Sequence, residues 1–348
     1  MNVSDFDFAL PDDLIAQQPP EERGQSRLLV LPRGEGRLEH TTFSHLVDYL
    51  HAGDLLVVND TRVFPARLLG RRVPTGGAVE CLLLRSLPTG DWDALMHPGQ
   101  KLRPGSRVVF EGSGAPLHGE VLARHFYGRR TIRLWTDDPA GVSAAIERLG
   151  HIPLPPYISR DDRPSDRERY QTVYAREAGS VAAPTAGLHF TPSLLAALED
   201  RGVERVALTL HVGYGTFKPV RAERVEDHEV DPEWYIVSTS AADALTRARR
   251  ERRRIIAVGT TTTRALESLF APDDEPIVPA HGETRLFIHP GHQFRLVSGL
   301  ITNFHLPRSS LLMLVAAFAG RDRVLAAYRE AIAARYRFYS YGDAMLIL

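Results

Sequence analysis

The sequence is poor in cysteine and in long apolar runs, and each shortage excludes a class of protein. Its one cysteine, Cys81, cannot form an internal disulfide and lies in an apolar run at residues 81–84, which favours a buried strand position over a nucleophile. A single thiol cannot build a thiolate metal site, and the 14 histidines show no ligand spacing, so we expect no metal. No stretch approaches the ~20 apolar residues of a membrane span and no signal-peptide pattern opens the chain, so we expect a cytoplasmic protein without membrane contact.

Lysine, glycine and net charge are also informative. Only two of the 42 basic residues are lysines, Lys101 and Lys218, which makes a lysine beside a candidate site noticeable. No Gly-x-Gly-x-x-Gly follows the first predicted strand, which argues against a dinucleotide-binding or ordinary methyltransferase Rossmann fold. The formal net charge of −1 excludes a uniformly basic surface, so a nucleic-acid partner has to be held by a local patch.

Two patterns alternate along the 348 residues, which is enough chain for more than one domain. Residues 1–64 and 151–348 alternate strands, polar loops and helices, so we expect one discontinuous α/β domain with a barrel-like arrangement. Residues 65–150 hold short apolar runs between Gly and Pro turns, which is typical of a small antiparallel β-barrel inserted into that domain. No surface helix shows a heptad seam, so we expect a monomer.

The α/β part contains four polar loops, each directly after a predicted strand. In sheets of this kind the carboxyl ends of the strands collect at one edge, where ligands usually bind, so we expect the four loops to converge. The strands with their loops are residues 180–183 with 184–190, 206–210 with 211–219, 255–258 with 259–263, and 294–301 with 302–307.

The loop at residues 259–263 precedes a predicted helix at residues 264–270. Free backbone N–H groups and the helix dipole favour an anion there, so Thr260 and Thr261 are candidates for binding a carboxylate or phosphate. The alternative is that the threonines only cap the helix, because the segment lacks the Walker lysine pattern.

Histidines and a lysine lie in the other loops. His211 and Lys218 flank a loop whose glycines, Gly213 and Gly215, allow close approach of the backbone to a ligand. The alternative is a surface lysine beside a turn and a histidine bonded to a core carbonyl. His189 and His305 each lie at a strand end before a helix start, where they suit either a general base or a loop anchor.

Two further segments combine charges. Residues 59–62 (NDTR) join an amide, the carboxylate of Asp60 and the guanidinium of Arg62, which suit a phosphate or carboxylate ligand or a structural Asp–Arg pair. A predicted helix at residues 240–254 ends in six arginines, which favour RNA contact or a solvated face that complements the helix dipole.

Taken together, these segments resemble the S-adenosylmethionine:tRNA ribosyltransferase-isomerase family of queuosine synthesis, along nearly the whole chain. The sequence departs from the family pattern at Asp231, which stands where relatives usually carry a second histidine. Thr262, Thr263 and Arg308 are further substitutions within matching motifs, and we expect them to be tolerated. The matching motifs are residues 58–63 (VNDTRV), 150–158 (GHIPLPPYI), 182–191 (AAPTAGLHFT), 211–217 (HVGYGTF), 258–261 (VGTT), 302–307 (TNFHLP) and 339–345 (YSYGDAM).

The resemblance implies a reaction and its substrates. The ribosyl group of S-adenosylmethionine is transferred and isomerised onto 7-aminomethyl-7-deazaguanine at the tRNA wobble position, giving epoxyqueuosine and releasing adenine and methionine. S-adenosylmethionine is then a co-substrate, and neither a prosthetic group nor a protein partner is implied. The sulfonium acidifies the 5′ carbon, a base removes that proton, and the acceptor amine attacks the 1′ carbon.

With the resemblance, the residues divide into two groups of candidates. The catalytic candidates are His189, His211, His305 and Lys218. The candidates for binding S-adenosylmethionine are Asp60, Arg62, Thr185, Gly187, Gly213, Gly215, Thr260, Thr261, Arg264, Asn303 and Asp343.

Two other functions stay open at this stage. One is an S-adenosylmethionine-dependent RNA methyltransferase, against which the missing glycine fingerprint counts. The other is a non-catalytic RNA-binding protein in which the inserted β domain does the binding, although four loops with His, Thr, Lys and Arg are more than binding requires.

Overall fold

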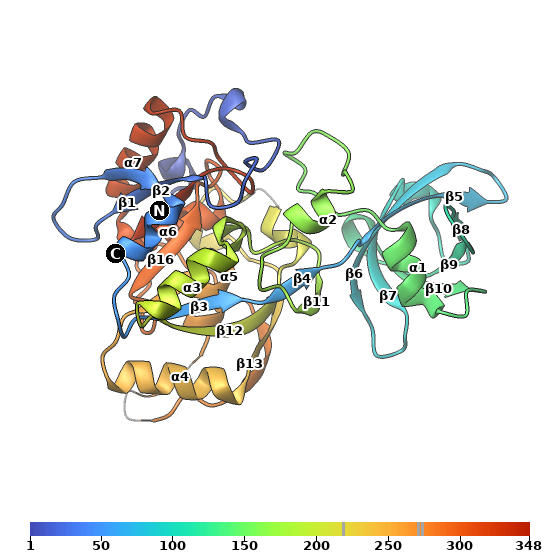
Figure 1. Ribbon diagram of the computed structural model, residues 1–348. Helices are drawn as coiled ribbons and strands as arrows, with labels where there is room; N and C mark the ends of the chain where they lie inside the picture. Colours follow the sequence, from blue (N-terminus) through green and yellow to red (C-terminus); the bar gives the residue numbers. More distant parts are fainter. Residues whose placement is uncertain (218–219, 270–271, 273–274) are drawn as a thin grey trace.

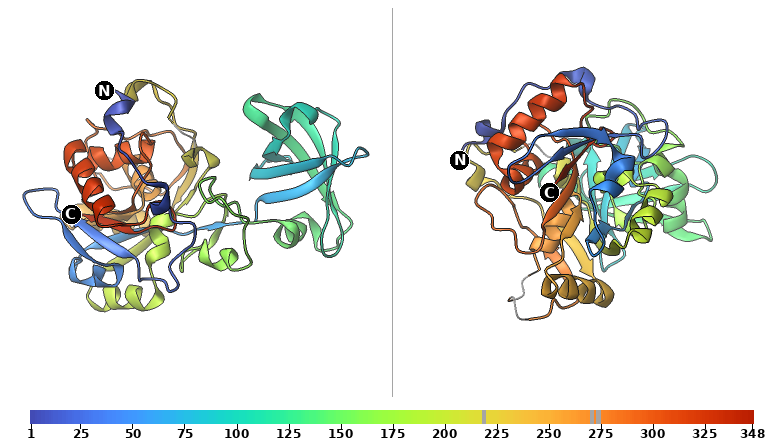
Figure 2. Two further views of the ribbon diagram at one scale, coloured as in Figure 1. Left: turned by 90° about the horizontal axis from the view of Figure 1, so that it is seen from above. Right: turned by 60° about the vertical axis from the view of Figure 1, so that its left-hand side comes forward.

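The computed structural model describes residues 1–217, 220–269, 272 and 275–348, and these form two parts (Figure 1). The larger part is a sheet covered by helices. The smaller part is a closed β-barrel, on the right of Figure 1. Figure 2 (left) shows the barrel standing apart from the larger part, with the connecting segments between them.

The larger part is built on a nine-stranded mixed sheet. Four neighbouring strands, β12, β3, β14 and β16, run parallel, so their carboxyl ends lie at the same edge. In sheet order the strands are β15 (Ala280–Thr284), β13 (Glu233–Val237), β12 (Glu204–His211), β3 (Leu55–Asn59), β14 (Ile255–Val258), β16 (Gly299–Asn303), β17 (Ala344–Ile347), β1 (Arg27–Leu31) and β2 (Glu39–Thr42).

Apolar residues cover both faces of this sheet. Successive residues of β3 alternate between two cores, with Leu55 and Val57 in one and Leu56 and Val58 in the other, because strand side chains alternate in direction. The first core includes α4 (Thr239–Arg250), α5 (Thr260–Glu267), α6 (Ser310–Ala319) and α7 (Arg321–Ala333). The second includes α3 (Pro192–Asp200) and the 3₁₀ helix η3 (Phe43–Asp48). Within the described residues, no helix combines the length and apolarity needed to cross a membrane.

The smaller part is a closed antiparallel barrel whose interior is filled by side chains. Cys81 is buried in it, and burial raises the pKa of the thiol, which fits an inert core residue. Helix α1 (Gly141–Leu149) packs on this core through Ala145 and Ile146. The strands are β5 (Arg67–Val73), β6 (Ala78–Ser86), β7 (Trp92–His97), β8 (Arg107–Phe110), β9 (Leu117–Arg124) and β10 (Arg129–Thr136).

The predicted fold class, an α/β main domain with an inserted antiparallel β-barrel, is confirmed. The main sheet has two edge strands, β15 and β2, rather than the closed order of the small barrel. The domain boundaries near residues 65 and 150 remain our proposal.

Three predicted elements need correction. The strand predicted at residues 294–301 starts at Gly299, because the N–H groups of residues 295–297 bind the carboxylate of Glu267 instead of a neighbouring strand. The strand predicted at residues 180–183 is β11 (Glu177–Ser180), which pairs with β4 (Thr61–Val63) outside the main sheet. The helix predicted from residue 264 begins at Thr260.

A buried arginine allows a stability test of the barrel. Arg130 on β10 is 1% exposed and donates to the carbonyls of Leu102, Arg129 and Gly99. We expect Arg130→Met to lower the free energy of unfolding by roughly 3 kcal/mol, because the buried carbonyl of Leu102 and two partly buried carbonyls lose their donor.

The matched control lies on the same strand. Arg133 pairs with Asp91, but its side chain is 61% exposed, so Arg133→Met is expected to cost less than about 1 kcal/mol. Urea unfolding followed by tryptophan fluorescence measures both variants. An equal decrease in the free energy of unfolding of Arg130→Met and Arg133→Met would contradict a structural role of the buried guanidinium.

Candidate active site

The polar loops lie at the carboxyl edge of the four parallel strands. The 3₁₀ helix η6 (Thr185–His189) packs beside β16, and a Cβ placed on Gly259 would lie 3.7 Å from Ala186, so η6 also reaches the start of α5. The positions at this edge are Asp60 and Thr61 after β3, His211 at the end of β12, Thr260 after β14 and Asn303 at the end of β16.

His211 is oriented by a hydroxyl and an aromatic ring. Its Nδ1 lies 2.7 Å from Thr61 Oγ1, and the Thr61 hydroxyl is in reach of the Glu177 carbonyl at 3.4 Å. If Thr61 donates to that carbonyl, it accepts a hydrogen bond from Nδ1–H, which leaves Nε2 with a lone pair. The imidazole ring stacks on the ring of Trp234, with 5.9 Å between the two ring centroids.

The surroundings of His211 keep it neutral and reachable. Burial lowers the pKa of the imidazole. The negative charges of Asp60 and Glu177 raise that pKa, but by less. The residue is only half-buried, and Nε2 has no hydrogen-bond partner among the described residues. His211 therefore offers one free proton acceptor at neutral pH.

Asp60 and Arg62 do not pair with each other. Asp60 is buried and accepts hydrogen bonds from Thr209 Oγ1 at 2.7 Å and Arg176 Nη2 at 3.0 Å. Arg62 instead lies 3.7 Å from Glu147 on α1, beside the barrel. Both Asp60 oxygens are thus engaged by the protein, and Arg62 lies toward the other domain.

A buried ion pair holds the loop after β12. Arg264 donates to Glu233 and, at 2.9 Å, to the Leu286 carbonyl. Glu233 in turn accepts from Gly213 N at 3.2 Å and Thr216 Oγ1 at 3.0 Å. Nη2 of Arg264 is buried and has no partner within the described part of the chain.

Two other positions belong to this loop. Any side chain at Gly215 would collide with the carboxylate of Asp231, so the departure from the family pattern packs directly against the loop. Lys218, a catalytic candidate, lies outside the described residues.

His189 and His305 are buried deeper than His211. His189 contacts Ser26 Oγ through Nδ1 at 2.8 Å and Asn303 Nδ2 through Nε2 at 3.1 Å, and burial lowers its pKa to about 4. His305 contacts Thr302 Oγ1 through Nε2 at 2.8 Å, and burial lowers its pKa to about 3. Both rings are neutral at pH 7 and bonded inside the protein.

The remaining binding candidates have contrasting surroundings. Thr260 and Thr261 form the first turn of α5, whose N–H groups have no intrahelical acceptor. Gly187 packs against the Tyr174 hydroxyl, where a Cβ would collide, and Thr185 opens the same 3₁₀ helix. Asp343 accepts from the N–H groups of residues 27 and 337 and from the Arg27 guanidinium at 2.9 Å, so its carboxylate binds the chain itself.

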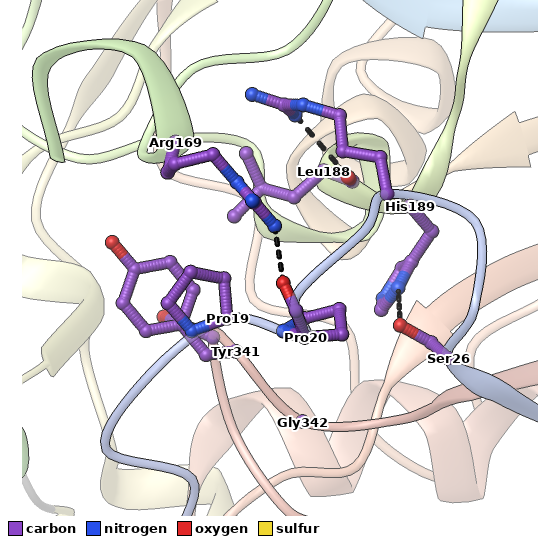
Figure 3. A pocket seen from close by; sticks show the side chains of 10 residues that line it. Pro19, Pro20, Ser26, Arg169, Leu188, His189, Tyr341 and Gly342 are labelled. Carbon is purple, nitrogen blue, oxygen red and sulfur yellow. Dashed lines mark hydrogen bonds between the residues drawn. The ribbon is translucent and has the colours of Figure 1, made fainter. Parts of the chain in front are cut away.

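A small pocket beside His189 contains two arginines that the sequence analysis missed (Figure 3). Arg23 donates to the carbonyls of Leu188 and Glu168, and Arg169 donates to those of residues 20 and 21. Among the described residues, neither arginine forms an ion pair with a carboxylate. The pKa of Arg23 is lowered by burial first and by Arg169 next. In the sequence these arginines stand in charged segments, where nothing distinguishes them from solvated residues.

A larger cleft separates the two domains. Its volume is about 480 Å³, which is within the range of small-molecule sites, and residues 152–156 form one wall. Arg67 and Leu82 contribute from the barrel, and Val181 and Tyr214 contribute from the main domain. Among the described residues, no group of three or more His, Cys, Asp and Glu side chains is arranged to hold a metal.

The two buried histidines predict acid sensitivity. Their pKa values in the folded protein lie below the ordinary value of 6.5, so the unfolded chain binds more protons once the pH falls below 6.5. Stability is therefore intact above pH 6.5 and is lost on acidification, by roughly 2 kcal/mol per histidine at about pH 5.

Urea unfolding at several pH values tests this sensitivity. In His305→Gln, the free energy of unfolding should depend less steeply on pH, with about one proton fewer taken up on unfolding. The amide keeps a polar group near Thr302 but does not titrate. His45→Gln is the control, since the His45 side chain is 61% exposed. If the free energy of unfolding depends on pH with the same slope in His305→Gln and in the unsubstituted protein, His305 is not a source of the acid sensitivity.

Comparisons with known proteins agree with one another. The sequence model described as "Queuosine biosynthesis protein" matches residues 3–347. The S-adenosylmethionine:tRNA ribosyltransferase-isomerase of Halothermothrix orenii is 50% identical over 348 residues, and that of Symbiobacterium thermophilum is 53% identical over 349, each with 100% of both chains covered. The crystal structure of S-adenosylmethionine tRNA ribosyltransferase from Thermotoga maritima has 39% identity and a TM-score of 0.55, covering 99% of this chain and 100% of its own. The chain therefore belongs to the queuosine biosynthesis protein family.

Proposed function

We propose that this protein transfers and isomerises the ribosyl group of S-adenosylmethionine onto a base of tRNA, with release of adenine and methionine. The acceptor is 7-aminomethyl-7-deazaguanine at the wobble position, and the product is epoxyqueuosine. The observation that carries the proposal is full-length identity of about 50% to relatives named for this activity. The same relatives disfavour a methyltransferase or a non-catalytic RNA-binding protein.

His211 is our candidate for the base that removes the 5′ proton beside the sulfonium. Three observations support it: a lowered pKa, an Nε2 without a partner among the described residues, and partial exposure at the strand edge. His189 and His305 are better suited to holding the loops, because each is buried and already hydrogen-bonded.

The methionine end of S-adenosylmethionine carries a carboxylate, for which the edge offers two kinds of donor. The first-turn N–H groups of α5, at Thr260 and Thr261, can receive an anion. The buried Nη2 of Arg264, which has no partner among the described residues, is a charged donor one turn later. Asp60 and Asp343 act in this proposal by fixing the strand ends, since their oxygens are already engaged.

The test of the function is a product analysis. Purified protein is incubated with S-adenosylmethionine and tRNA bearing the aminomethyl-deazaguanine, followed by chromatography and mass spectrometry of the digested nucleosides. We expect adenine release matched by a ribosyl-derived mass gain. A methyl gain with S-adenosylhomocysteine would indicate a methyltransferase, and binding without either product would indicate a non-catalytic protein.

The role of Thr61 gives a sharper prediction. Thr61→Val removes the acceptor of His211 Nδ1–H and frees the tautomer, so kcat should fall about ten- to a hundredfold while KM for S-adenosylmethionine changes little. Thr61→Ser keeps the hydroxyl and is expected to retain most of the activity. In the unsubstituted enzyme, kcat/KM should decline only as the pH falls below the ordinary histidine range, because the pKa of His211 is lowered.

A valine variant with unchanged kcat would remove Thr61 from the mechanism. A profile that loses activity above neutral pH, and not below it, would remove His211 as the base.

A further inference from the structure

The hairpin between β9 and β10 presents two aromatic side chains to solvent. Phe126 is 86% exposed and Tyr127 is 90% exposed, whereas the next most exposed large apolar side chain among the described residues, Val278, is 62% exposed. Their ring centroids lie 6.5 Å apart with planes tilted by 49°, so each ring presents a separate face. Folding gains almost nothing from burying either ring.

The backbone under these rings is strained. Tyr127 has φ 54° and Gly128 has φ 84°, and a hairpin turn with two consecutive positive φ values favours Asn-Gly or Gly-Gly. A bulky residue in this region costs of order 1–3 kcal/mol. Because the ring is 90% exposed and contacts the equally exposed ring of Phe126, burial does little to offset that cost, and the tyrosine is better explained by an external ligand than by stability.

The same end of the barrel is basic. No Asp or Glu occurs at residues 94–110 or 121–136, the turns of this end with the strands beside them, although the whole chain has a net charge of −1. Asp93 and Glu120 lie just outside these segments and pair with Arg129 and Arg107. The segments are adjacent, because a Cβ on Gly99 would lie 3.7 Å from Gly128 and Arg130 donates to the carbonyl of Leu102. The exposed basic side chains are Lys101, Arg103, Arg107, Arg124, His125 and Arg129.

One side chain at this end is close enough to the loop after β12 to sense a charge beside it. Arg129, two residues after Tyr127, pairs with Asp93. This pairing is the main cause of the raised pKa of Arg129, and the charge of Asp231 in the main domain raises the pKa further. Asp231 packs against Gly215 in the loop after β12. A second contact between the domains joins Arg85 on β6 to Glu283 on β15 at 3.2 Å.

We infer that Phe126 and Tyr127 form a stacking tip that holds unpaired bases of the RNA substrate while the surrounding basic side chains bind its phosphates. Aromatic rings stack on any exposed base but not on bases inside a duplex, and cations supply the sequence-independent attraction. The inference rests on the proposed function for its choice of RNA. It assigns the tip to the unpaired loop next to the modified base.

The test measures binding without turnover. A labelled RNA hairpin with the unpaired loop of an anticodon arm is titrated with the full-length protein, and a blunt RNA duplex is titrated in parallel. The double variant Phe126→Ala/Tyr127→Gly should weaken hairpin binding about tenfold or more and leave duplex binding unchanged. Since glycine suits the positive φ, this variant is not expected to unfold the barrel.

Two further variants control the result. Phe126→Tyr/Tyr127→Phe keeps both rings and should bind the hairpin like the unsubstituted protein. Trp135→Ala removes an aromatic side chain on β10 that is already stacked on His118, and it should leave hairpin affinity unchanged.

Unchanged hairpin affinity in the double variant would overturn the inference, as would an equal loss for hairpin and duplex. Loss of self-association in the double variant, without loss of RNA affinity, would assign the tip to a second copy of the chain and also overturn it. If the unsubstituted protein releases no adenine, the proposed function fails, while the hairpin titration still decides the role of the tip.

Discussion

The side-chain amide of Asn59 is the interaction on which the arrangement of the site depends. The ladder between β3 and β12 runs to Asn59 and Leu208, and beyond it the amide itself binds Leu210, donating to its carbonyl at 2.9 Å and accepting from its N–H at 3.0 Å. The amide oxygen also accepts from Thr61 N at 3.1 Å. Because a side chain replaces the backbone partner, the two strands separate without leaving buried polar groups unpaired. That separation places Thr61 beside His211 and sends β4 toward the barrel.

Burial then decides which charges remain available for a substrate. The carboxylates of Asp60, Glu233 and Asp343 are engaged by arginines and by hydroxyl or backbone donors of the protein. Each buried histidine is kept neutral by desolvation. Among the described residues of the site, the groups left with spare capacity are a proton acceptor and a cationic donor, His211 and Arg264. This is the set that a reaction needs when it removes a proton from a sulfonium substrate that also carries a carboxylate.

Local patterns carried enough information to predict much of the fold, but not the long-range partners. The helix start expected after His189 was predictable because capping is local, and Thr191 does accept a hydrogen bond from Leu194 N. The first part of the strand expected at residues 294–301 is not a strand, because a distant carboxylate, Glu267, binds the N–H groups of residues 295–297. The same limit hid the role of Asp343, which is set by Arg27, 316 positions away in the sequence, and the placement of Arg23 and Arg169 in one pocket. Sequence spacing cannot show such contacts, since they exist only after folding.

The connection between the domains joins the barrel to the loop after β12. The chain enters and leaves the barrel side by side, because Arg67 and His151 exchange backbone hydrogen bonds of 3.1 and 2.8 Å. The ion pairs between the domains, including Arg85 with Glu283, are exposed and each is worth about 1 kcal/mol or less. The apolar contacts matter more, and they include Tyr214, which packs against the barrel core from the loop that Glu233 holds. A shift of the barrel on its narrow connection therefore also displaces the backbone next to His211.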